Sequence, residues 1–78
     1  MRVFVDGFGI LGLTIVRKLL ENHSIQKSEL FVNSYLLSEN SQFLDFLKAS
    51  NITFFDLPYK ELEKEILAFR PDYFLSIY

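Results

Sequence analysis

The stretch RVFVDGFGILGLTIVRKLL, residues 2–20, decides the fold of this chain. Its first part, Arg2–Asp6, is a short apolar run typical of a buried strand, and its last part has the apolar spacing of a helix. Between them lies the pattern G-x-G-x-x-G, formed by Gly7, Gly9 and Gly12. In α/β folds, a strand that passes through such a turn into a helix builds a pocket for phosphate or another anion, because free N–H groups gather at the helix N-terminus.

The three glycines have different expected roles. The first allows the tight turn, the second lets a ligand approach the backbone, and the third lets the helix pack close to the strand. We therefore predict a loop that binds a substrate or a phosphate, and its residues are Gly7, Phe8, Gly9, Ile10 and Gly12. The same glycines could also serve only as the tight turn that any doubly wound sheet needs.

Three further alternations of helix and strand follow the opening stretch. Strands are expected at residues 29–35, 52–57 and 73–78, and helices are expected after Ser38 or Asn40 and from Lys60 to Phe69. We expect Asn51 to stop the first of these helices in the left-handed conformation. Pro58 ends the third strand, and Arg70-Pro71-Asp72 ends the last helix, because the residue before a proline avoids the α region.

The resulting order, β-α-β-α-β-α-β, predicts an α/β fold with a four-stranded parallel sheet and right-handed crossovers. We interpret it as a Rossmann-like half-domain with strand order 3-2-1-4, which places the first and fourth strands side by side. Ligands of such sheets bind where the carboxyl ends of those two strands meet. Asp6 and Tyr78 should therefore line the cleft. The order 2-1-3-4 fits the same pattern and stays open at this point.

The composition describes one domain with a large apolar content. Half of the 78 residues are hydrophobic and nine are phenylalanine, which is more apolar surface than so small a body hides easily. A four-stranded parallel sheet also leaves two open edges. We therefore expect residues 1–78 to be the N-terminal part of a larger catalytic domain, or else a chain that forms a homodimer through an exposed sheet edge.

Charge and cysteine content exclude several classes of function. The net charge is −2 with acids and bases interspersed, so no nucleic-acid patch is evident. The chain has no cysteine, which excludes thiolate chemistry, and we expect no metal site. No signal peptide or membrane segment is recognisable, which makes the cytoplasm the expected compartment. His23 is the only histidine, and its place after the first helix favours a capping or surface role.

One functional hypothesis is a dinucleotide-binding domain of the NAD(P) type. Such domains carry an acidic residue about 20 residues after the glycines, and this residue binds the ribose hydroxyls. Asn33, Ser34 and Tyr35 stand at that position here. Asn33 could donate to a ribose and Ser34 could serve a 2′-phosphate, but no arginine or lysine stands nearby. The missing acid weakens the NAD(P) hypothesis.

A second hypothesis comes from a resemblance. Residues 66–78, ILAFRPDYFLSIY, together with the opening strand, glycine turn and helix, resemble the N-terminal part of the formyltetrahydrofolate-dependent formyltransferases. This family includes the methionyl-tRNA, glycinamide ribonucleotide and nucleotide-amino-sugar enzymes. Residues 51–55, NITFF, are similar to the step that opens the third strand in that family. The similarity spans the whole chain, which is less than half of a typical catalytic domain.

The resemblance implies transfer of a formyl group from 10-formyltetrahydrofolate to a small-molecule amine or phosphorylated substrate. In the family, the catalytic Asn, His and Asp follow the fourth strand, so the resemblance assigns no catalytic residue here and His23 does not match. The folate pocket is built mostly after that strand, and Tyr78 at most borders it. Residues 7–10 correspond to a loop near the amine substrate. We expect the 78 residues alone to be inactive, and a non-catalytic dimerising half-domain is a third hypothesis.

Overall fold

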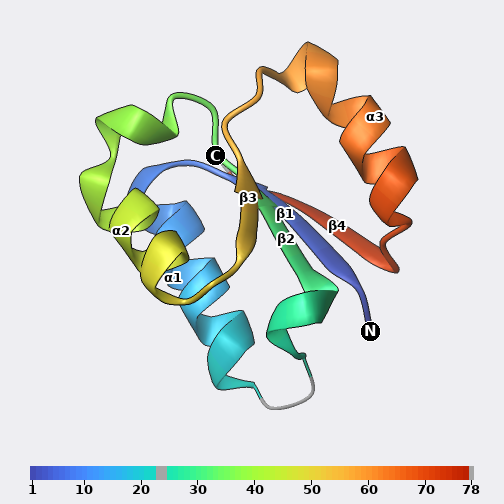
Figure 1. The fold of residues 1–78 in the computed structure, drawn as a ribbon, viewed down its shortest axis with the longest axis horizontal. Helices are drawn as coiled ribbons and strands as arrows, with labels where there is room; N and C mark the ends of the chain where they lie inside the picture. Colours follow the sequence, from blue (N-terminus) through green and yellow to red (C-terminus); the bar gives the residue numbers. More distant parts are fainter. Residues whose placement is uncertain (23–24, 78) are drawn as a thin grey trace.

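The computed structural model describes residues 1–22 and 25–77, which form a four-stranded, all-parallel sheet with helices on both faces (Figure 1). This arrangement confirms the predicted α/β class. The elements are β1 (Val3–Gly7), α1 (Gly9–Glu21), β2 (Leu30–Asn33), α2 (Ser41–Ala49), β3 (Thr53–Phe55), α3 (Tyr59–Phe69) and β4 (Tyr73–Ile77), with 3-10 turns η1 (Lys27–Glu29) and η2 (Leu37–Glu39).

The strand order is β3-β2-β1-β4, which confirms the predicted order 3-2-1-4 and shows that 2-1-3-4 is wrong. β1 lies between β2 and β4, and Gly7 is paired in register with Ile77. The main chain continues this pairing beyond the strands, because the Phe8 N–H donates to the Ile77 carbonyl oxygen at 3.1 Å. The glycine turn therefore lies directly beside the carboxyl end of β4.

The side chains of each strand alternate between two cores. On one face, Val3 and Val5 of β1 are buried with residues of α1 and α2 such as Val16 and Phe43. On the other face, Phe4 is buried with residues of α3, and its ring contacts four other phenylalanine rings at centroid distances of 5.9–6.4 Å. Figure 1 shows the same division, with α1 and α2 on one side of the sheet and α3 on the other.

The ends of the elements follow local sequence signals. The Asn40 side chain caps α2 by accepting a hydrogen bond from the Phe43 N–H at 3.2 Å. Asn51, after α2, has a φ of 57°, which confirms the expected left-handed stop. Arg70 ends α3 in the same region of φ, at 53°, immediately before Pro71.

Two strands are shorter than the sequence indicates. β2 covers Leu30–Asn33 where residues 29–35 were expected, and β3 covers Thr53–Phe55 where residues 52–57 were expected. The early end of β3 has a physical cause. The N–H and carbonyl of Leu57 bond to the side chain of Asn33 instead of a strand, so the main chain leaves the sheet after Phe55.

Candidate functional site

The loop predicted at residues 7–12 is shorter in the structure, because β1 ends at Gly7 and α1 begins at Gly9, which leaves Phe8 alone between them. Gly7 and Gly12 are required by the close packing of this strand and helix. A Cβ atom placed on Gly7 would lie 2.8 Å from the Gly12 Cα, and one placed on Gly12 would lie 2.8 Å from the Phe43 Cε2. β1 and α1 approach one another closely at this point, and α2 closes over the contact through Phe43. The structure therefore agrees with the expectation that Gly12 lets the helix pack near the strand.

Gly9 differs from the other two glycines. Its φ is +57°, a conformation that side chains disfavour. A Cβ atom placed on it would have one neighbour within 4 Å outside the adjacent residues, the Asn40 Nδ2 at 3.7 Å. The space beside Gly9 is thus open, and its left-handed φ, not close packing, requires glycine at this position.

Asn40 is a candidate site residue that sequence reasoning missed. Its Oδ1 caps α2, and its Nδ2 lies next to Gly9, at the start of α1. Two helix N-termini and a side-chain amide donor therefore meet at one point on the carboxyl edge of the sheet, an arrangement that favours an anion. The sequence indicated Asn40 only as a possible cap, because nothing in the spacing brings residue 40 next to residue 9.

Exposed apolar side chains surround the start of α1. Phe8 and Ile10, both predicted site residues, are 50% and 61% exposed, and Leu11 is exposed as well. Tyr35 and Leu36, which follow β2 at the same edge of the sheet, are also exposed. The site thus combines N–H donors with apolar surface, which suits a ligand that has an anionic group and a ring.

Asp6, predicted to line the cleft, is fully buried at the end of β1. Its Oδ1 accepts a hydrogen bond from the Asn33 Nδ2 at 3.0 Å. Alternation along the strand puts Asp6 on the same face as Phe4, which is the face covered by α3. Asp6 is therefore buried under the carboxyl end of the sheet, where it contributes to the packing beneath the site and does not line the cleft with an exposed side chain.

Asn33 joins three segments at the end of β2. Besides its bond to Asp6, its Nδ2 donates to the Leu57 carbonyl at 3.1 Å, and its Oδ1 accepts from the Leu57 N–H at 2.8 Å. Both ends of the amide are therefore used within the protein, and the residue is fully buried. Ser34, the other residue considered for a ribose or a 2′-phosphate, is 1% exposed.

The remaining sequence predictions concern other parts of the chain. Tyr78 and His23 lie outside the described residues. In the described ranges, no cluster of three or more His, Cys, Asp or Glu side chains is placed to hold a metal ion. The structure has no helix in residues 1–22 and 25–77 with the length and apolar character to cross a membrane.

Among the described residues, Glu29 has a lowered pKa, and this residue is remote from the site. The pKa of Glu29 is lowered by its hydrogen bond with the Met1 amino group at 2.5 Å and by the hydrogen bond from the Gln26 N–H. Glu29 directly precedes β2, so it lies at the amino ends of the strands, and the glycine turn lies at their carboxyl ends. This ion pair therefore joins the amino ends of β1 and β2 and takes no part in the site.

Comparison with known proteins adds no family assignment. A scan of protein-family models found no match to this sequence, and a search of curated proteins found no significant match.

Proposed function

We propose that this chain forms the substrate-binding half of a formyltransferase that moves a formyl group from 10-formyltetrahydrofolate to an amine. In this proposal, the glycine turn holds an anionic or phosphorylated part of the amine substrate. The residues that transfer the proton and most of the folate pocket belong to a segment outside these 78 residues. The reaction would take place in the cytoplasm.

The observation that carries the proposal is the open space at Gly9. Gly7 and Gly12 are explained by close packing, whereas Gly9 combines a left-handed φ with an open position beside the Asn40 Nδ2. The φ accounts for glycine at this position, and the open space beside the Asn40 Nδ2 leaves room for an anionic group of a ligand. The strand order supports the proposal further, because it places the turn beside the end of β4, where ligands of parallel sheets bind.

The buried amide of Asn33 favours this proposal over a dinucleotide site. In an NAD(P) site, the residue at the end of the second strand binds the ribose hydroxyls. Asn33 uses both of its Nδ2 hydrogens and its Oδ1 within the protein, so ribose binding would require three hydrogen bonds to be broken or shared. A ligand held at Gly9 and Asn40 needs no such rearrangement.

The chain itself supplies binding and orientation. The N–H groups at the starts of α1 and α2 and the Asn40 amide attract negative charge, and the apolar side chains beside them exclude water from one side of the ligand. Proton transfer by a positioned base typically contributes about 10²–10⁴-fold in rate. Because the proposal assigns that base to a segment beyond these residues, we expect no formyl transfer by the 78 residues alone.

Replacing Gly9 with valine tests the binding site. We expect Gly9→Val to weaken binding of a nucleoside-diphosphate-linked amino sugar at least about tenfold, because its side chain would fill the open position beside Asn40. The measurement is a titration of amide chemical shifts by two-dimensional NMR, with NAD⁺ as a second probe. In the parent chain, the amino sugar should shift the Gly9 and Asn40 signals more than NAD⁺ does.

Asn51→Val is the matched control, because Asn51 has the same φ of 57° and lies at the other end of α2. Both variants place a β-branched residue in a disfavoured conformation, so both should lose similar stability. Only Gly9→Val should lose affinity. Equal affinity in all three chains would mean that the glycine loop is only a turn, and stronger shifts with NAD⁺ would favour the dinucleotide hypothesis.

A further inference from the structure

The two edges of the sheet are built differently. β3 has three residues and is followed by Asp56 and Pro58, and a short strand next to a charge and a proline is a poor template for another chain. β4 has five residues, none of them charged and none of them proline. In the described part of the chain, β1 is its one partner strand. Pro71 and Asp72 precede β4, but the strand itself is longer than β3 and carries no charge and no proline that would block pairing along its length.

The hydrogen bonds of β4 show which of its main-chain groups point outward. The Tyr73 N–H donates to the Arg2 carbonyl, and the Ile77 carbonyl accepts from the Phe8 N–H, so both residues face β1. Main-chain groups alternate in direction along a strand, which assigns Leu75 to the same side. Phe74 and Ser76 then present their N–H and carbonyl groups to the open side.

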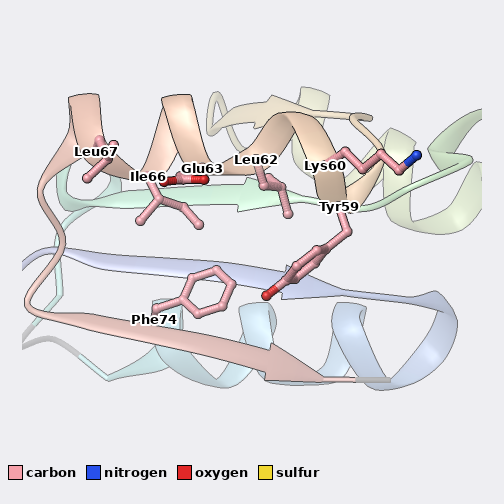
Figure 2. Close-up of a pocket in the computed structure, with 7 residues that line it drawn as sticks. All are labelled: Tyr59, Lys60, Leu62, Glu63, Ile66, Leu67 and Phe74. Carbon is pink, nitrogen blue, oxygen red and sulfur yellow. The ribbon is translucent and has the colours of Figure 1, made fainter.

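An apolar groove lies beside this edge. It has a volume of about 420 Å³ and runs between α3 and β4, as Figure 2 shows. Its lining residues are Tyr59, Lys60, Leu62, Glu63, Ile66, Leu67 and Phe74. Tyr59 is 72% exposed, and Phe74 forms the floor on the β4 side. An unprotected strand edge and an exposed apolar groove thus occupy the same side of the molecule.

We propose that this side forms a symmetric dimer, in which β4 pairs antiparallel with β4 of a second copy about a two-fold axis at Leu75. In this register, Phe74 of each copy lies opposite Ser76 of the other. These are the two residues with outward-pointing main-chain groups, so they form hydrogen-bonded pairs, and Leu75 meets its own counterpart in a non-hydrogen-bonded pair. The result is one continuous eight-stranded sheet.

The strand is complementary to itself in this register. The large Phe74 is placed beside the small Ser76 on the face covered by α3, and two leucines meet on the other face, where Leu75 already packs against the core. A strand from an unrelated partner would need to provide this match, whereas a second copy has it by symmetry.

The exposed area fits a weak dimer. Aromatic side chains have about 150–250 Å² each, so Tyr59, Tyr73 and Phe74 together expose on the order of 300 Å² per copy at exposures of 72%, 58% and 37%. Small specific interfaces need roughly 600 Å² per partner. Leu67, 66% exposed, and the main chain of β4 add to this area, but the aromatic contribution is only about half of that requirement, which indicates a weak interface. We therefore expect a dissociation constant in the micromolar range or higher.

Single cysteines test the register directly, because the chain has no cysteine of its own. In the proposed dimer, the two Leu75 Cα atoms lie about 4.5 Å apart, within the range for a disulfide. The two Tyr73 Cα atoms lie about 14 Å apart, which is too far. Leu75→Cys should therefore form a disulfide-linked dimer under mild oxidation, and Tyr73→Cys should not. Equal cross-linking of the two variants, or none in either, would overturn the proposed register.

A second pair of variants tests the interface without cross-linking. Ser76→Pro removes an outward N–H and leaves the bonds to β1 in place, so its dimer dissociation constant should rise roughly tenfold or more. Ser76→Thr keeps the N–H and should dimerise like the parent. Sedimentation from about 10 µM to about 1 mM gives the constants, with circular dichroism to check folding. A parent chain that stays monomeric at every concentration overturns the proposal. The open side of β4 would then pair with a different segment.

The dimer is proposed for residues 1–78 and does not rest on the proposed function, but a further segment that paired with β4 would compete with the second copy for this edge. The interface is an edge of the sheet, and the glycine turn is at the carboxyl ends of its strands. Gly9→Val should therefore dimerise as the parent does, and Ser76→Pro should keep its affinity for the amino sugar. The two proposals can fail separately.

Discussion

Replacing Gly7 with alanine should lower the free energy of unfolding by about 2–3 kcal/mol, the cost of forcing an extra methyl group into a packed interior. The new Cβ would lie 2.8 Å from the Gly12 Cα. That neighbour is main chain, so relief requires α1 to move away from β1 and would disturb the contact with Phe43. A domain of this size has a total stability of roughly 4–12 kcal/mol, and urea denaturation followed by circular dichroism would detect the loss easily.

Gly9→Ala is the matched control for this prediction. The same methyl group at Gly9 has open space, and its cost is the left-handed φ of +57°, about 1–2 kcal/mol. Gly7→Ala should therefore cost more than Gly9→Ala, and it should also reduce the ordered packing of α1. If Gly9→Ala were the more destabilising of the two, the close approach of Gly7 and Gly12 would not determine how the helix packs on the strand.

Much of the fold could be predicted because its signals are local. The apolar run of β1, the glycine spacing and the alternation of strands and helices each depend on neighbouring residues, and together they indicate a parallel sheet. The choice of strand order required a further assumption, since the pattern fits both 3-2-1-4 and 2-1-3-4. The ends of β3 could not be predicted, because the Leu57 main chain bonds to the side chain of Asn33, 24 residues away.

The site residues also differ in whether local sequence signals reveal them. The glycines could be found from their spacing, and the structure shows that Gly9 is the one with open space. Asn40 could not be predicted as a site residue from the sequence, because its approach to Gly9 depends on how α2 packs against α1. Asp6 was expected to line the cleft on account of its position at the end of β1. Its burial follows from the alternation of side chains and from the amide of Asn33, which lies on the neighbouring strand.

Asn33→Ala should lower the free energy of unfolding by about 3 kcal/mol. The substitution removes three hydrogen bonds, and each contributes about 1 kcal/mol net, with a larger cost where a buried partner is left unsatisfied. One partner is the buried carboxylate of Asp6, and the others are the N–H and carbonyl of Leu57. The connection between β3 and α3 should loosen as well, which faster amide hydrogen exchange at Leu57 would report.

A double-mutant cycle separates the bond to Asp6 from the bonds to Leu57. Asp6→Ala removes the carboxylate, so Asn33→Ala in that background no longer deprives it of the hydrogen bond from Nδ2. The double variant should therefore be more stable than the sum of the two single losses predicts, by about 1 kcal/mol or more. Additive losses would mean that the bond between Asp6 and Asn33 contributes no net stability. The role of Asn33 would then be to hold Leu57, and the carboxylate would be retained for a reason other than its hydrogen bond to the amide.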